Sequence, residues 1–177
     1  MKIKSPEVVT IGLGYIGLPT SALIASHGTY VLGVDINQNV VDTINQGKIH
    51  IVEPDLDAIV HKAVTQGKVR AFKSPEAADA FLIAVPTPFF PTKNATQIPQ
   101  PNLKYIQAAA LSIAVVLKKG DLVILESTSP VGTTEKMANW LAGARSDLTF
   151  PQTHGEESDI RIAYCPERVI PGRIVPV

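Results

Sequence analysis

The stretch Val8-Val9-Thr10-Ile11-Gly12-Leu13-Gly14-Tyr15-Ile16-Gly17-Leu18 decides the fold predicted for this chain. An apolar, β-branched run leads into Gly-x-Gly-x-x-Gly and a helical pattern, the sequence form of a strand, a tight turn and a helix N-terminus. Gly12 permits the turn, Gly14 lets a pyrophosphate approach the backbone, and Gly17 lets the helix lie close to the strand. We therefore expect the helix N-terminus to bind a dinucleotide phosphate.

An acidic residue follows the second predicted strand, residues 30–34. This residue, Asp35, comes roughly 20 residues after the glycines, where an acceptor for the adenosine ribose hydroxyls is expected. Asp35 repels the 2′-phosphate of NADP, and no arginine follows it, so the pattern predicts NAD as the cofactor. The alternative for Asp35 is a helix cap or a surface carboxylate.

The rest of the chain alternates strand-like and helix-like segments. Asn37 is expected to cap the second helix. The crossovers between strands are long enough for helices, which predicts a Rossmann-type α/β fold, a doubly wound parallel sheet of order 3-2-1-4-5-6. The expected strands are residues 8–11, 30–34, 69–72, 80–85, 121–126 and 160–164, and the main helices 16–27, 38–46, 55–66, 103–117 and 134–141.

Composition narrows the class of protein. The chain has 177 residues, 45% of them hydrophobic and 18% charged, with zero net charge, which predicts one globular domain over residues 1–177 and no nucleic-acid partner. No apolar run is long enough for a transmembrane helix, so we expect no membrane partner. The N-terminus lacks the features of a signal peptide, and the balance predicts a cytoplasmic protein.

Several connecting segments carry weaker signals. Residues 74–78 suggest one helical turn, residues 89–102 a mobile flap, and residues 143–158 a polar connection. Cys165, the single cysteine, directly follows an apolar strand and has no basic flanking residue, so we expect a buried small hydrophobe rather than a nucleophile. The four histidines have no metal-ligand spacing, which predicts surface residues and no metal site.

Polar residues gather at the carboxyl ends of the predicted strands, where ligands bind in this fold. Thr87 could bind a cofactor phosphate or ribose, or satisfy backbone in its own turn. Thr128 and Thr134 flank a tight turn, and either is alternatively a helix cap. Glu167 could act as a general base or orient a water, or pair with Arg168.

Six motifs then occur in a fixed order and cover essentially the whole chain. They are Gly-Leu-Gly-Tyr-Ile-Gly-Leu-Pro-Thr, Val-Asp-Ile-Asn, His-Ile-Val-Glu-Pro-Asp-Leu, Ala-Val-Pro-Thr-Pro, Glu-Ser-Thr-Ser-Pro-Val-Gly-Thr-Thr and Cys-Pro-Glu-Arg-Val-Ile-Pro-Gly. Together they resemble the UDP-glucose/GDP-mannose dehydrogenase family. The resemblance implies oxidation of the C6 hydroxyl of a nucleotide-sugar, such as a UDP-sugar, to a carboxylate with NAD⁺ used twice.

The resemblance also implies roles for individual residues. Thr128 matches a threonine that helps to position the catalytic water, and Glu167 matches a carboxylate implicated in proton transfer and thioester hydrolysis. Arg168 and Val169 match positions that contact the sugar nucleotide. The positions that contact NAD in the family are matched by Tyr15, Ile16, Asp35, Thr87 and Thr134.

Two departures from the family pattern matter. Pro171 stands where UDP-glucose members carry a second glutamate, which makes UDP-glucose a less expected substrate. The family's central helical region, with its lysine and asparagine, and its second Rossmann-like domain, with a cysteine in Gly-Gly-His-Cys, have no counterpart in the sequence. We therefore expect an NAD-binding domain cut from a longer, homodimeric enzyme, inactive by itself.

Two other interpretations stay open. The chain could be a standalone nucleotide-binding or interaction module, or part of a 3-hydroxyacid-type dehydrogenase, although the latter would not explain the Pro-Glu-Arg motif. Because the family's central helices would otherwise cover apolar surface, we also expect self-association or lowered stability of the 177 residues.

Overall fold

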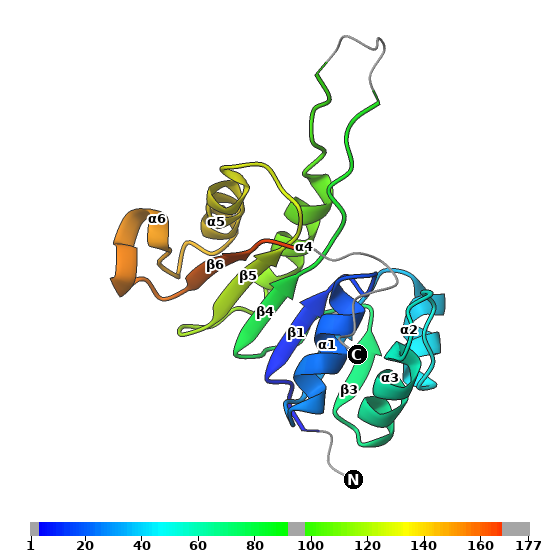
Figure 1. Ribbon diagram of the computed structural model, residues 1–177. Coiled ribbons are helices and arrows are strands. Elements are labelled where there is room, and N and C mark those ends of the chain that lie inside the picture. Colours follow the sequence, from blue (N-terminus) through cyan, green and yellow to red (C-terminus); the bar gives the residue numbers. More distant parts are fainter. Residues whose placement is uncertain (1–3, 92–97, 168–177) are drawn as a thin grey trace.

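In the described residues, six parallel strands form one sheet. The computed structural model describes residues 4–91 and 98–167 (Figure 1). The strand order is β3-β2-β1-β4-β5-β6, which confirms the predicted Rossmann-type topology. The strands are β1 (Val8–Ile11), β2 (Val31–Val34), β3 (Val69–Phe72), β4 (Ala80–Ile83), β5 (Leu122–Glu126) and β6 (Arg161–Cys165).

The first strand lies at the centre of the sheet. Val8 of β1 is in register with Val31 of β2 on one side and with Ala80 of β4 on the other. The chain thus proceeds outward in one direction through β2 and β3, then returns to build β4, β5 and β6 on the opposite side. This reversal between β1 and β4 leaves a crevice at the carboxyl ends of the strands, where ligands bind in open α/β sheets.

Helices cover both faces of the sheet and bury two separate apolar clusters. One cluster joins β2 and β3 to α1 (Gly17–Ser26), α2 (Gln38–Asn45) and α3 (Leu56–Thr65). The other joins β1, β4 and β5 to α4 (Lys104–Ala114) and α5 (Thr133–Ala144). The alternating side chains of β1 show the division, because Val9 and Ile11 enter the second cluster while Val8 packs against the first.

Local sequence signals set several helix ends. The side chain of Asn37 accepts a hydrogen bond of 3.0 Å from the backbone N–H of Asn39, so the predicted cap of α2 is confirmed. The helices otherwise begin and end within a few residues of the predicted bounds. Among the described ranges, no helix combines the length and apolar character that crossing a membrane requires.

Two predictions for connecting segments were wrong. Residues 74–78 form no helical turn. The segment 143–158, predicted as a polar connection, contains α6 (Pro151–His154) and the 3₁₀ helix η1 (Gly155–Glu157). Phe150, only 1% exposed, anchors this segment in the core, and Pro151 starts α6, where its missing N–H has no cost. Such short helices have no periodicity from which to predict them.

Cys165 is exposed, so the prediction of a buried small hydrophobe was wrong. It lies at the end of β6, the edge strand of the sheet, where the residues along the strand are exposed or only partly buried. The apolar run that precedes Cys165 indicated a strand correctly, but it did not indicate that the strand would lie at an edge.

The predicted flap, residues 89–102, begins and ends as a paired arm that extends away from the sheet (Figure 1). Phe89 and Pro101 form an antiparallel bridge, and the N–H of Phe90 donates to the carbonyl of Gln100 at 2.8 Å. Residues 92–97 lie outside the described ranges. The mobility predicted for this flap stays a prediction.

A candidate dinucleotide site at the carboxyl ends of the strands

The glycine loop between β1 and α1 is packed too tightly for side chains at two of its three glycines. A Cβ on Gly17 would lie 1.9 Å from the carbonyl oxygen of Gly12. A Cβ on Gly12, whose φ is +93°, would lie 2.7 Å from the carbonyl oxygen of Ala84. By contrast, nothing lies within 4 Å of a Cβ built on Gly14. The open space above Gly14 is where a pyrophosphate would approach the backbone.

The helix that follows this loop presents its N-terminus without a capping side chain. Ile16 is the N-cap residue, and in the described chain no side chain makes a capping hydrogen bond at this end of α1. The first turn holds no acidic residue. The first backbone N–H groups of a helix have no intrahelical partner. In α1, Leu18 donates its N–H to the carbonyl of Gly14 and Pro19 has no N–H, so what the N-terminus offers an anion is mainly the positive end of the helix dipole.

Asp35 connects the first two strands at their carboxyl ends. Its Oδ2 accepts a hydrogen bond of 3.1 Å from the N–H of Leu13, and its Oδ1 accepts one of 2.9 Å from the N–H of Asn37. Asp35 thus binds the glycine loop and the residue that caps α2; it is partly buried and is neither the helix cap nor the exposed surface carboxylate of the alternative. Each carboxylate oxygen has a second lone-pair site, so Asp35 retains acceptor capacity for ribose hydroxyls.

Two adjoining pockets lie on either side of the turn at Gly12. One, of about 450 Å³, is lined by the glycine loop and by residues after β4, β5 and β6. The other, of about 470 Å³, is mostly apolar and lies between the ends of β1 and β2 and helix α4. Both pockets are lined by Gly12, Asp35, Val85 and Pro86. Each pocket has the size of a small-ligand site, and Asp35 lies where the two meet.

The first pocket brings together most of the residues that the sequence analysis selected. Its lining includes Gly12, Gly14, Tyr15, Ile16, Asp35, Thr87, Thr128 and Glu167. Gly17 is buried beneath the loop rather than exposed in the pocket.

Three of these residues form a chain of hydrogen bonds. The hydroxyl of Thr87 donates to the backbone carbonyl of Thr128, and the hydroxyl of Thr128 donates to Oε2 of Glu167 at 2.9 Å. The hydroxyl of Thr87 therefore bonds to the loop after β5 rather than to the backbone of its own turn. The hydroxyl of Thr128 bonds to Glu167 and does not cap a helix. The two bonds link the ends of β4, β5 and β6.

The remaining predicted residues lie elsewhere. Thr134 lies in the first turn of α5 and does not line either pocket; the N-cap of this helix is Gly132, so Thr134 is not a cap. Arg168 and Val169, and with them the alternative ion pair of Glu167 with Arg168, lie outside the described residues.

Sequence reasoning missed two groups in and beside the site. Glu126, the last residue of β5, lines the pocket with Glu167, and its place after an apolar strand was an available signal. His50 lies close enough to Asp35 for the carboxylate to affect it: burial lowers the pKa of His50, and the charge of Asp35 opposes that shift. In the described ranges, no cluster of three or more His, Cys, Asp or Glu side chains could hold a metal ion.

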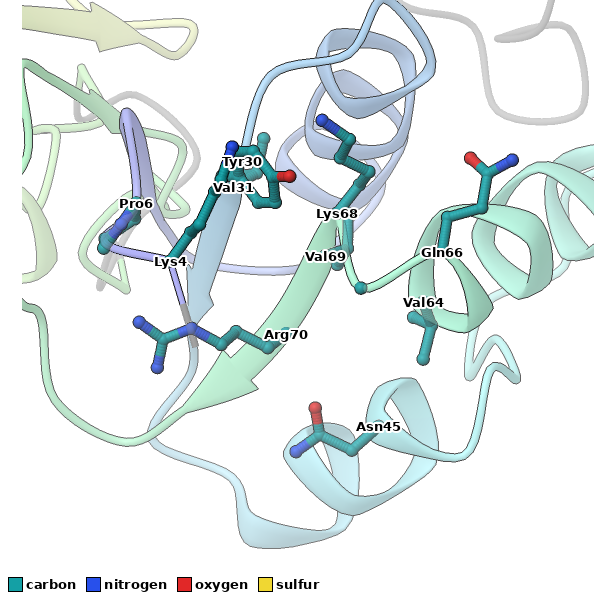
Figure 2. Close-up of a pocket in the computed structure, with 11 residues that line it drawn as sticks. Lys4, Pro6, Tyr30, Val31, Asn45, Val64, Gln66, Lys68, Val69 and Arg70 are labelled. Carbon is teal, nitrogen blue, oxygen red and sulfur yellow. The ribbon is translucent and has the colours of Figure 1, made fainter. Parts of the chain in front are cut away.

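A further pocket, of about 530 Å³, lies at the opposite edge of the sheet, at the amino ends of β2 and β3 (Figure 2). The Nζ atoms of Lys4 and Lys68 lie 4.7 and 3.7 Å from the centre of the Tyr30 ring. Hydrogen bonds and positive charge from the two lysines lower the pKa of Tyr30. None of the predicted site residues lines this pocket, and strand amino ends are not where ligands bind in this fold.

Known proteins resemble this chain over nearly its whole length. Residues 6–176 match the NAD binding domain of the UDP-glucose/GDP-mannose dehydrogenase family. A UDP-N-acetyl-D-mannosamine dehydrogenase of Campylobacter jejuni is 63% identical over 169 residues, which are 96% of this chain and 40% of that protein. An NDP-N-acetyl-D-galactosaminuronic acid dehydrogenase of Ralstonia nicotianae is 62% identical over 168 residues, which are 95% of this chain and 38% of that protein. The chain thus spans about 40% of the length of these relatives.

A solved structure has the same fold as this chain. The UDP-N-acetyl-mannosamine dehydrogenase of Staphylococcus aureus superimposes with a TM-score of 0.82 at 39% identity, over 94% of this chain and 38% of that one. The glycine loop, the acid after β2 and the matched residues 6–176 lead to one conclusion: this chain belongs to the UDP-glucose/GDP-mannose dehydrogenase family and corresponds to its N-terminal NAD binding domain.

Proposed function

We propose that this chain binds NAD as the cofactor domain of a UDP-N-acetyl-D-mannosamine 6-dehydrogenase, which oxidises the sugar C6 hydroxyl to a carboxylate. The observation that carries the proposal is the pair of adjoining pockets around Gly12, with open space over Gly14 and the Thr128–Glu167 pair at the far end. Relatives that are named for this activity and are more than 60% identical support it.

Each part of the site has its own role in the proposal. The loop from Gly12 to Gly17 holds the pyrophosphate through backbone N–H groups, and Asp35 accepts from the adenosine ribose. Thr87 and Thr134 are proposed as further cofactor contacts, although Thr134 lines neither pocket. When bound, NAD⁺ accepts a hydride from the sugar carbon.

Glu167 is the proposed acid–base group. Its carboxylate is oriented by the hydroxyl of Thr128 at 2.9 Å, and a carboxylate held in this place could accept a proton or orient a water. Arg168 and Val169 are proposed to contact the sugar nucleotide. The family's nucleophilic cysteine and its lysine have no match in the sequence, so we expect binding without turnover by these 177 residues.

The sugar is the least determined part of the proposal. The relative from Ralstonia nicotianae, named for an N-acetyl-D-galactosaminuronic acid, is as similar as those named for N-acetyl-D-mannosamine. A second nucleotide-sugar 6-dehydrogenase is therefore the alternative. The other open interpretation is a standalone nucleotide-binding module. Cytoplasmic location, a homodimeric whole enzyme and self-association of the 177 residues stay predictions.

Calorimetry and a chimera test the proposal. The 177-residue chain should bind NAD more tightly than NADP and should not form NADH with UDP-N-acetylmannosamine. Joined to the part of the Campylobacter jejuni relative that it does not cover, it should form NADH with that sugar. The chimera carrying Glu167→Gln is the matched control and should bind NAD without oxidation. A chimera that binds NAD but oxidises neither acetylated sugar nucleotide would contradict the proposed activity, and absence of NAD binding would contradict the cofactor site.

A further inference from the structure

The pocket at the strand ends contains a second carboxyl group besides Glu167. Glu126 ends β5 and lines the same pocket. In the sheet Glu126 is in register with Cys165 of β6, two residues before Glu167. Because neighbouring strands lie about 4.8 Å apart, the two glutamates come from adjacent points on one edge of the sheet.

The two oxygens of Glu126 have different surroundings. Oε1 accepts a hydrogen bond of 3.2 Å from the hydroxyl of Thr20, which lies in α1 just after the glycine loop. Oε2 is buried and has no hydrogen-bond partner within the described part of the chain, and the same is true of the neighbouring hydroxyl of Ser127. Glu126 therefore ties α1 to β5, the strand that leads to Thr128, while its other oxygen has no partner among the described residues.

The charges around Glu126 are unfavourable for an ionised carboxylate. The titratable groups that line the pocket with it are Asp35, Glu167 and the phenol of Tyr15; the described lining holds no lysine, arginine or histidine. An ionised carboxylate with a buried, unpaired oxygen is costly. Burial raises the pKa of Glu126, the hydrogen bond from Thr20 partly opposes this, and the charge of Glu167 adds to the rise.

We propose that Glu126 is a positioning residue of the cofactor site and that NAD binding, on which this inference rests as part of the proposed function, is coupled to uptake of a proton by its carboxyl group. Bound NAD would exclude water from the pocket, and loss of water favours the neutral form of a carboxyl group whose Oε2 has no hydrogen-bond partner in the described chain. The proton comes from solvent and forms an O–H bond at Oε2. Oε1 continues to accept from Thr20.

Proton-linked calorimetry tests this coupling on the 177-residue chain. NAD binding is measured in two buffers of different ionisation enthalpy at a series of pH values, so that the difference in heat gives the protons taken up. The wild-type chain should take up a fraction of a proton, at most one, per NAD. In Glu126→Gln the NAD that still binds should bring no proton uptake, whereas Glu157→Gln, at an exposed carboxylate of η1, should behave like the wild type.

A second variant tests the hydrogen bond that Glu126 accepts from Thr20. Thr20→Val removes the hydrogen bond that favours ionised Glu126, so the pH of maximal proton uptake should rise. The ¹³C NMR signal of the Glu126 carboxyl in the wild-type chain reports the same group directly. Its titration midpoint should rise when NAD is added.

The outcomes separate this inference from the proposed function. Equal proton uptake by the wild type and Glu126→Gln, or an NMR midpoint that NAD does not move, overturns the role of Glu126 and leaves the cofactor site intact. Absence of NAD binding by the wild type overturns the cofactor site, and the coupling with it. If Glu126→Gln does not fold, the wild-type NMR midpoint alone decides.

Discussion

The hydroxyl of Thr128 donates a hydrogen bond of 2.9 Å to Glu167, across 39 residues of intervening sequence. The bond exists because β5 and β6 are parallel neighbours, with Glu126 in register with Cys165, so that the loops after both strands leave the sheet at one edge. Each residue was predicted as a candidate from its own motif. Their contact makes the threonine a group that orients the carboxylate.

Replacing Thr128 by valine should remove this bond without disturbing the phosphate site. We expect NAD affinity to change by less than about threefold, because the bond orients Glu167 rather than the cofactor, and the free energy of unfolding to fall by about 1 kcal/mol or less. Thr128→Ser, which keeps the hydroxyl, is the control. Calorimetry measures the affinity, and the ¹³C signal of the Glu167 carboxyl should shift in Thr128→Val alone. A tenfold loss of NAD affinity would show that Thr128 instead contacts the cofactor.

Alanine at Gly14 and at Gly17 should affect different properties. Gly17→Ala places a Cβ 1.9 Å from the carbonyl oxygen of Gly12, so the free energy of unfolding should fall by about 1–3 kcal/mol or more. Gly14→Ala meets nothing within 4 Å, so stability should stay close to the wild type while NAD binding weakens at least tenfold. Thermal unfolding and calorimetry separate the two effects. Unchanged NAD affinity in Gly14→Ala would place the pyrophosphate elsewhere.

Removing the carboxylate of Asp35 should weaken the cofactor site in two ways. Asp35→Ala loses the acceptor for the N–H groups of Leu13 and Asn37 and the proposed acceptor for the ribose hydroxyls. At about 1.5–3 kcal/mol for a hydrogen bond to a charged group, NAD affinity should fall by roughly 10- to 100-fold. Asp35→Asn, which keeps one acceptor oxygen, should lose less. NADP affinity equal to NAD affinity in the wild type would contradict the assigned role.

The ion pair of Asp159 with Lys119 should make the free energy of unfolding depend on pH. The hydrogen bond from Lys119 first, and those from Thr149, lower the pKa of Asp159 from 3.8 to about 2. A carboxyl whose pKa is depressed in the folded state stabilises the fold above its unfolded pKa, and the contribution is lost as the pH falls through the folded value. Asp159→Asn should therefore be less stable than the wild type above about pH 4, and the difference should vanish toward pH 2.

Urea unfolding at several pH values measures this difference. Lys119→Met, which removes the partner whose Nζ lies 2.7 Å from Oδ1 of Asp159, should show the same pattern. A stability difference that is constant between neutral pH and pH 2 would exclude the ion pair as its cause.

The exposed position of Cys165 predicts its reactivity. A thiol reagent should label the native 177-residue chain at one site without prior unfolding, since Cys165 is its single cysteine. If the chain self-associates through the β6 edge, labelling should slow as protein concentration rises, and light scattering should show larger particles. Labelling that requires denaturant would restore the buried position that the sequence suggested.

The sequence by itself determined the strand order, the glycine loop and the acid after β2. These depend on local patterns: a β-branched run, glycines where a Cβ meets backbone, and crossovers long enough for helices. The same patterns predicted the places of Thr87, Thr128 and Glu167 at strand ends, because parallel strands present all their carboxyl ends at one edge.

Only the tertiary structure decided which of these residues meet, and which neighbours they have. The Thr128–Glu167 bond, the Thr20–Glu126 bond across 106 residues and the exposed edge at Cys165 all depend on register and on strand position in the sheet. An apolar run has the same sequence pattern in a central strand and in an edge strand. Its burial depends on which elements pack against it. For the same reason the unsatisfied oxygen of Glu126 became visible only when α1, β5 and β6 were assembled around it.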